Sequence, residues 1–161
     1  MTTNPWLLAL QQIHSLCQGH AEALQEALHD IAKRALTAAD YSHLAKADRR
    51  VLDQFAYRYT RLQDDIGARF MPAVLKALGE EIASMSAIDR MARLEQLGWL
   101  PSAEAWMMLR QIRNEFTHDY PDDITERYER FQAAIDASKQ LLAVLDQFNQ
   151  KMTLLVRPSA P

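Results

Sequence analysis

The chain has 161 residues, 48% of them hydrophobic, and a formal net charge of −3. This length suits a single domain with a substantial core, and the 4 glycines and 6 prolines argue against disorder and against a sheet with many turns. The negative charge gives no support for nucleic-acid binding by the whole surface, so any RNA site must be a local basic patch.

The cysteine content and the N-terminal residues narrow the class further. Cys17 is the only cysteine, which excludes an intramolecular disulfide and a thiolate metal cluster. It lies in an apolar helical pattern, which predicts a buried structural thiol. No signal-peptide pattern opens the chain, and no stretch is apolar for long enough to cross a membrane. We therefore expect a soluble, cytoplasmic protein.

A long first helix is predicted over residues 5–36, where apolar residues recur at spacings of three and four. Gly19 is its candidate kink or break, and residues 39–43 are expected to form a loop. Three histidines lie along this helix: His14, His20 and His29. Their spacing places no two of them one turn apart on the same face, so the pattern gives no metal site.

A second long helix is predicted over residues 48–70 by the same periodicity. Its polar side carries charged residues, several of them paired at i, i+4: Arg58, Arg61, Asp65 and Arg69. This ladder favours a solvated ion-pair face. Alternatively, Arg61 or Asp64 lines a cleft if a later helix packs nearby. Pro72 is expected to bend the helix or to restart it.

Capping residues bound the remaining helices. In chain order the predicted signals are a capping box at Ser86 and Asp89, a C-terminal stop at Gly98, an N-cap at Ser102, and an N-cap at Asp122 or Asp123. Long amphipathic helices joined by short loops predict an all-α fold, namely an antiparallel four-helix, up-and-down bundle with a short accessory helix. Residues 1–155 are expected to form this single domain, and residues 156–161 a flexible C-terminal tail.

The segment 108–120 combines an apolar stripe with a dense group of polar side chains. On an ideal helix these polar side chains share one broad face: Arg110, Arg113, Asn114, Thr117, His118 and Tyr120. Pro121 is expected to end the helix at about Tyr120, which places His118 in the last turn. A guanidinium beside a titratable imidazole suits binding a phosphate and moving a proton next to it. The alternative is an exposed polar face with an ordinary histidine.

The order Arg113-Asn114-x-x-x-His118-x-Tyr120 resembles the Arg-(four residues)-His-x-Tyr signature of the HEPN superfamily of small all-helical proteins. The Asn after the Arg is frequent in that signature. The chain resembles in particular the HEPN toxin encoded beside a minimal nucleotidyltransferase antitoxin. Residues 55–67 and 97–102 and Trp106 agree with that group, and the resemblance covers roughly residues 45–150.

This resemblance implies a toxin of a toxin-antitoxin system, a metal-independent endoribonuclease that needs no cofactor and cleaves RNA at a composite site across a homodimer. It implies proton transfer by His118, stabilisation of the charged phosphate by Arg113, and orientation of the histidine or phosphate binding by Asn114. Further candidates for binding the RNA backbone are Arg110, Thr117 and Arg61. In the resembling family the motif Tyr, here Tyr120, is where the nucleotidyltransferase attaches AMP and silences the ribonuclease.

Two other readings of the same residues remain open. One is a non-catalytic partner of a nucleotidyltransferase that uses the polar face to hold a nucleotide or substrate phosphate. The other is a purely structural helical bundle, with neither activity nor an oligomer.

Overall fold

The computed structural model describes residues 4–118 and 123–156, and every regular element within these ranges is a helix. The all-helical class expected from the periodicity is therefore confirmed. None of the helices in these ranges combines the length and the apolarity that crossing a bilayer requires.

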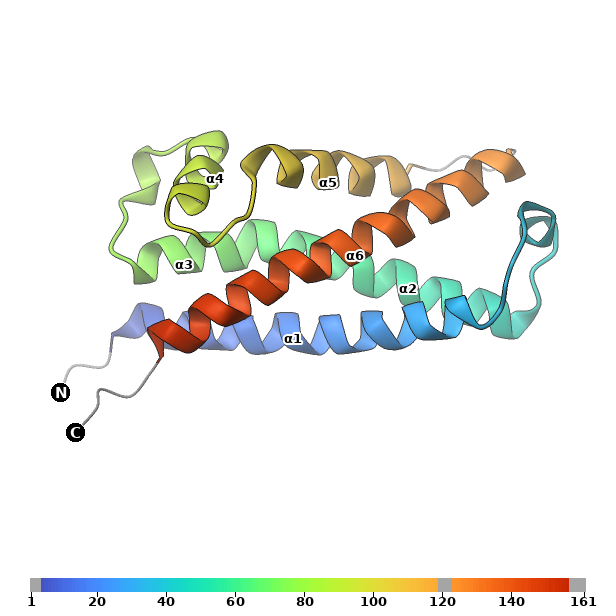
Figure 1. Ribbon diagram of the computed structural model, residues 1–161, viewed down its shortest axis with the longest axis horizontal. Coiled ribbons are helices and arrows are strands. Elements are labelled where there is room, and N and C mark those ends of the chain that lie inside the picture. Colours follow the sequence, from blue (N-terminus) through green and yellow to red (C-terminus); the bar gives the residue numbers. More distant parts are fainter. Residues whose placement is uncertain (1–3, 119–122, 157–161) are drawn as a thin grey trace.

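Six α-helices and three shorter helical turns follow one another along the described residues. They are α1 (Pro5–Ala32), η1 (Ala38–Ser42), α2 (Lys46–Asp65), η2 (Ile66–Phe70), α3 (Met71–Ala77), η3 (Ile82–Ser84), α4 (Ala87–Gln96), α5 (Ala103–Phe116) and α6 (Ile124–Leu155). In Figure 1, α2 and α3 lie in line and run antiparallel to α1, α6 crosses them diagonally, and the short α4 sits at one end beside α5. The principal packing partners are α1 with α2 and α5 with α6.

The first helix begins where the sequence predicts. The Asn4 side chain accepts the backbone N–H of Trp6 at 3.0 Å, and Pro5 occupies the first turn, where its missing N–H is not needed. The helix runs through Gly19 without a break, because the residues around this glycine are buried against the core and hold the helix in place. Cys17 is buried as expected, and burial raises the pKa of its thiol to about 12.

The segment 39–43 is not an irregular loop. It lies largely within the 3₁₀ turn η1, which Thr37 and Asp40 stabilise by capping each other's backbone. The ring of Tyr41 is buried there, edge-on to Tyr128 of α6 with ring centroids 5.4 Å apart. An aromatic anchor in the connection explains why the segment folds back onto the bundle.

A π-helical turn joins α2 to α3. In η2 the backbone N–H of Met71 donates to the carbonyl of Ile66, five residues earlier, rather than four. Pro72 follows in the first turn of α3. The bend or restart predicted at Pro72 therefore takes the form of one widened turn within a helical rod that otherwise continues (Figure 1).

The predicted caps of the later helices are confirmed. Ser86 and Asp89 form the capping box of α4, and Gly98 follows α4 with φ of +77°, a conformation that costs glycine little. Ser102 accepts the N–H of Ala105 at the start of α5. Of the two candidates for α6, Asp123 is the cap and accepts the N–H of Glu126 at 3.1 Å.

Aromatic side chains fix the C-terminal end of α5 against its neighbours. The ring of Phe116 lies 5.0 Å from that of Phe131 on α6 and 5.5 Å from that of Tyr59 on α2, centroid to centroid, in edge-to-face geometry. The Phe55 ring stacks on that of Tyr59 at 5.5 Å. This cluster holds α5, called the motif helix below because it carries Arg113 and Asn114, against α2 and so places its polar residues.

Candidate active site

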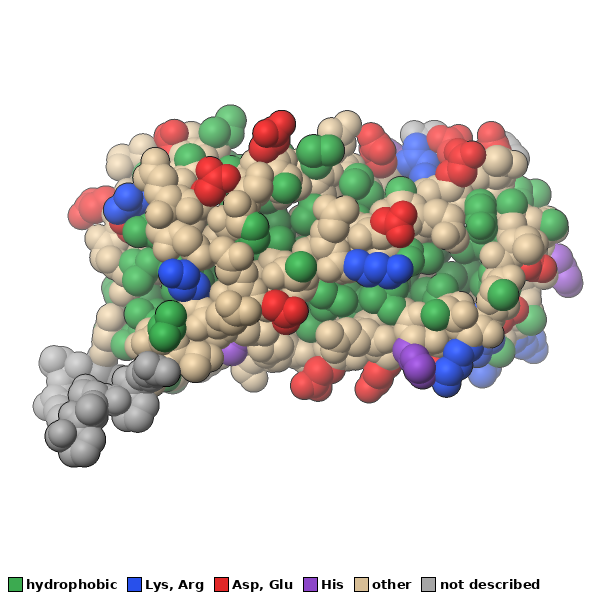
Figure 2. All heavy atoms as spheres, viewed as in Figure 1, with side chains coloured by type: hydrophobic (Ala, Val, Ile, Leu, Met, Phe, Trp, Pro, Cys, Tyr) green, Lys and Arg blue, Asp and Glu red, His purple; other side chains and the backbone are tan. Residues whose placement is uncertain are grey.

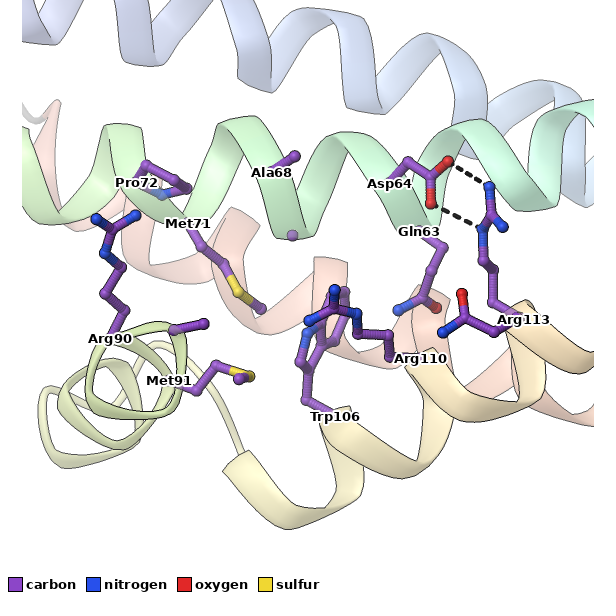
Figure 3. A pocket seen from close by; sticks show the side chains of 13 residues that line it. Gln63, Asp64, Ala68, Met71, Pro72, Arg90, Met91, Trp106, Arg110 and Arg113 are labelled. Carbon is purple, nitrogen blue, oxygen red and sulfur yellow. Dashed lines mark hydrogen bonds and ion pairs between the residues drawn. The ribbon is translucent and has the colours of Figure 1, made fainter. Parts of the chain in front are cut away.

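A cleft of about 530 Å³ lies between the α2–η2–α3 rod on one side and α4 with α5 on the other (Figure 3). This volume falls within the range typical of small-molecule sites. Its polar lining comes from three helices: Gln63 and Asp64 of α2, Arg90 of α4, and Arg110, Arg113 and Asn114 of α5. Its apolar walls include Met71, Met91 and Trp106. The cleft thus joins two predicted segments, 48–70 and the motif helix.

Arg113 is held by a two-point ion pair with Asp64. Its Nε donates to Oδ1 at 2.8 Å and one terminal nitrogen donates to Oδ2 at 2.6 Å, while the other donates to the Thr117 hydroxyl at 3.2 Å. A two-point contact fixes the plane of the guanidinium as well as its position. Because the Arg113 side chain is 23% exposed and that of Asp64 is 47% exposed, the pair orients the arginine within reach of a ligand.

The cleft concentrates positive charge on a chain that is negative as a whole. Three guanidinium groups and one carboxylate line it, whereas the formal net charge of the chain is −3. In Figure 2, basic and acidic side chains are interspersed over the face shown, and no broad basic patch covers it. Positive charge is therefore concentrated locally where α5 faces α2.

His118 does not share this cleft within one chain. It is exposed and lines a separate hollow of about 50 Å³ with Phe116, Phe131 and two arginines of α6, Arg127 and Arg130. The prediction that Arg113 and His118 share one helical face is therefore wrong for a single copy. The cause is an earlier helix end, since α5 stops at Phe116 rather than near Tyr120.

Side chains satisfy the last carbonyls of α5 and so end it early. The Thr117 hydroxyl donates to the carbonyl of Asn114 at 3.0 Å, and the Arg130 guanidinium of α6 donates to the carbonyl of Glu115. The backbone N–H of His118 also donates to Glu115, in a tight turn of the 3₁₀ type. Tyr120, the predicted AMP acceptor, and Pro121 lie outside the described residues.

The remaining predicted residues divide between the cleft and the outer surface. Asn114 and Arg110 line the cleft, and Thr117 supports Arg113 as described. Arg61 is exposed, and its guanidinium lies 6.0 Å from the ring centroid of Tyr57. It is not among the residues that line the cleft. Arg61 and Asp64 were the two predicted candidates on α2 for lining a cleft. Asp64 contacts Arg113 in the cleft, whereas Arg61 lies outside it.

Gln63 and Arg90 are polar cleft residues that the sequence pattern did not single out, and Gln63 is the more unusual of the two. It is only 2% exposed, and neither polar atom of its amide has a hydrogen-bond partner among the described residues. One turn earlier the Tyr59 hydroxyl is also buried and unpaired within the same part of the chain, and burial raises the pKa of Tyr59. In the sequence, the one sign that Gln63 is buried is its position one turn after the aromatic core residue Tyr59.

A second polar cluster lies on the opposite side of α2. Arg58 donates to Nδ1 of His20 at 3.0 Å, and Nε2 of His20 lies 3.3 Å from Oδ2 of Asp65. His20 and Asp65 are 4% and 6% exposed, so the predicted solvated position of Asp65 is wrong. Burial is the main cause that lowers the pKa of His20. The described residues include no group of three or more His, Cys, Asp or Glu placed to hold a metal ion.

Comparisons with protein-family models, with curated proteins and with solved structures found no match to this chain. The functional argument therefore starts from the geometry of α5: a guanidinium fixed at a basic cleft, and an imidazole exposed just beyond the end of the same helix.

Proposed function

We propose that this protein is a HEPN-type ribonuclease toxin of a toxin-antitoxin pair, a cytoplasmic enzyme that cleaves RNA with protein side chains alone. The observation that carries the proposal is that α5 presents Arg110, Arg113 and Asn114 to one basic cleft of an acidic chain. In this proposal α1, the α2–α3 rod, α5 and α6 are the four helices of a HEPN bundle, and α4 is its accessory helix.

RNA cleavage of this kind needs a base and an acid. The base removes the proton of a 2′-hydroxyl, whose oxygen attacks the adjacent phosphorus, and the acid protonates the 5′-oxygen as its bond to phosphorus breaks. The products are a 2′,3′-cyclic phosphate and a 5′-hydroxyl. His118 transfers the protons, while Arg113 stabilises the extra negative charge on the phosphate oxygens in the transition state. Asn114 holds the phosphate beside it, and Arg110 contacts the next phosphate along the RNA backbone.

A homodimer supplies what one chain lacks. The motif gives one imidazole per copy, and within a copy His118 and Arg113 line different hollows. A two-fold axis beside α5 would bring both motif helices to one RNA strand. The exposed side chains of Met107 and Met108, 41% and 60% accessible on α5, support a contact there because they offer apolar surface next to the motif.

A cognate minimal nucleotidyltransferase would silence the enzyme by attaching AMP to Tyr120, two residues beyond His118. The added nucleotide brings bulk and negative charge next to the catalytic groups and repels the RNA phosphates. We expect Tyr120→Phe to retain RNA cleavage in the presence of the transferase and ATP, while the wild-type protein loses it. Equal loss in both proteins would place the modification elsewhere.

Cleavage of single-stranded RNA by the purified protein tests the main proposal. Arg113→Ala and His118→Ala should each abolish cleavage and growth arrest, with circular dichroism spectra like that of the wild type. The matched control is Arg49→Ala, which removes an exposed α2 arginine outside the cleft and should cleave normally. Wild-type protein that binds a nucleotide but leaves RNA intact would instead establish the non-catalytic partner of a nucleotidyltransferase.

A further inference from the structure

The amide of Gln63 is the least satisfied polar group of the cleft. The residue is 2% exposed, and both its donor and its acceptor lack a partner among residues 4–118 and 123–156. A buried amide without hydrogen bonds destabilises the fold. Such groups are rare in folded proteins, and one explanation of them is a functional role. In Figure 3 the side chain of Gln63 extends from α2 towards α5, close to Trp106 and Arg110.

The walls next to this amide are apolar. Trp106, Met71 and Met91 are each no more than 6% exposed and line the same cleft. The Trp106 ring approaches the backbone of Gly67 so closely that a Cβ there would lie 3.2 Å from a ring carbon. Gly67 belongs to the π-helical turn η2, and such turns occur frequently at functional sites. An aromatic and thioether wall beside a donor–acceptor pair suits a planar heterocycle.

Basic groups flank this wall on both sides. In Figure 3, Arg90 of α4 lies towards one end of the cleft, Arg113 towards the other, and Arg110 between them. Arg90 is tied to the carbonyl of Ile82 at 2.8 Å, and Arg113 to Asp64. Arg110 is exposed and has no hydrogen-bond or ion-pair partner among the residues described, which leaves its guanidinium available to a phosphate.

We propose that this cleft is a nucleobase pocket, in which the Gln63 amide pairs with the edge of an adenine of single-stranded RNA and Arg110 binds the phosphate of that nucleotide. The inference rests on the proposed function in that the adenine belongs to the RNA substrate. It adds base selection to a site otherwise built for phosphate.

Adenine fits the amide better than the other bases do. The Gln63 side chain offers one acceptor and one donor side by side. Adenine presents the complementary donor and acceptor on both of its accessible edges, as N6–H with N7 and as N6–H with N1. On the N7 edge guanine presents two acceptors, N7 and O6, which cannot satisfy both the donor and the acceptor of an amide, and the pyrimidines have no corresponding pair there.

Binding of the four nucleoside 5′-monophosphates to the full chain tests the pocket without requiring cleavage. Isothermal titration calorimetry should give 5′-AMP about tenfold higher affinity than CMP, UMP, GMP or inorganic phosphate. Gln63→Leu should remove this preference while the thermal unfolding temperature stays equal or rises, because the variant no longer buries an unpaired amide. Gln54→Leu, an exposed position of α2, should keep the preference. Arg110→Gln should weaken binding of all four nucleotides.

Cleavage of RNA oligomers forms the second arm. The wild-type protein should cut an oligomer with one adenine among cytosines at that adenine, and Gln63→Leu should cut it without preference. Equal affinity for all four nucleotides, or an AMP preference that survives Gln63→Leu, would overturn the pocket even if RNA is cleaved. Conversely, a Gln63-dependent AMP preference in a protein that leaves RNA intact would keep the pocket and remove the ribonuclease.

Discussion

Asp64 and Asp65 are adjacent in α2, but their carboxylates face different helices and belong to different polar clusters. Asp64 faces α5 and holds Arg113 with contacts of 2.8 and 2.6 Å. Asp65, about 100° further round the helix, faces α1 and lies 3.3 Å from His20. The first pair is partly exposed and orients a proposed catalytic group, whereas the second is buried and belongs to the packing of α1 on α2.

Asp64→Asn tests whether the ion pair positions Arg113. The neutral amide cannot hold both guanidinium nitrogens as the carboxylate does, so the arginine loses its fixed plane. We expect RNA cleavage to fall by about one to two orders of magnitude, since small displacements of a catalytic group have effects of that size. The free energy of unfolding should change by less than about 1 kcal/mol, because the pair is partly solvated. Single-turnover cleavage and urea unfolding measure the two quantities, and an unchanged cleavage rate would show that Asp64 has no positioning role.

His20 predicts a pH dependence of stability. Burial and the neighbouring Arg58 and Arg61 lower its pKa below the ordinary 6.5, although Asp65 opposes them. The unfolded chain therefore binds a proton as the pH falls through 6.5, while the folded chain remains neutral at His20. The contribution to stability is complete above that pH and decreases below it, until the pH reaches the lowered pKa of the folded state.

Thermal unfolding at about pH 7.5 and about pH 5.5 checks this sign, because His is the side chain that ordinarily titrates between them. We expect the unfolding temperature of the wild type to fall at the lower pH and that of His20→Gln to fall less. His29→Gln, an exposed position of the same helix, should behave like the wild type. An identical fall in all three proteins would remove His20 as the cause.

At the scale of the element, the motif helix depends on its neighbours at both ends. Ser102 starts α5 by a local side-chain contact, and its end depends on Arg130 of α6, 15 residues away in sequence. On the opposite side of the cleft the π-helical turn η2 brings Gly67 against Trp106. The shape of the cleft is therefore set by contacts between elements as well as by the helix itself.

The sequence predicts those features whose causes are local. The helical periodicity, the cap at Ser102 and the capping box at Ser86 depend on residues within one turn, and all three are confirmed. The end of α5, the Asp64 contact with Arg113 across 49 residues and the burial of Gln63 depend on partners far along the chain. Periodicity cannot locate such partners, and for this reason the helical face that it predicts for His118 is wrong.

Two glycines in helices separate backbone propensity from packing. A Cβ at Gly19 of α1 would meet nothing within 4 Å, whereas one at Gly67 would lie 3.2 Å from the Trp106 ring. Gly19→Ala should therefore raise the free energy of unfolding by about 0.5–1 kcal/mol, the usual gain of alanine over glycine in a helix. Gly67→Ala should gain less or lose stability, because Trp106 must move. Urea unfolding compares them, and equal gains would show that the Trp106 contact imposes no constraint.

At the scale of the whole molecule, the proposed activity depends on where the arginines lie and on a second copy of the chain. The chain is acidic as a whole, and three arginines line the cleft beside α5 with a single carboxylate. One copy places Arg113 and His118 in separate hollows. A second copy related by a two-fold axis would supply the missing neighbour, because the Arg113 of one copy would then act on the same RNA phosphate as the His118 of the other.

Subunit mixing tests this shared site most directly. Arg113→Ala and His118→Ala proteins are combined in equal amounts, allowed to exchange subunits, and assayed with single-stranded RNA beside the wild type and each variant alone. We predict that the mixture recovers a measurable part of the wild-type cleavage rate while each variant alone has none, because one intact guanidinium and one intact imidazole then meet in the same dimer. An active wild type whose variants remain inactive when mixed, or a wild type that leaves the RNA uncut, would contradict the account.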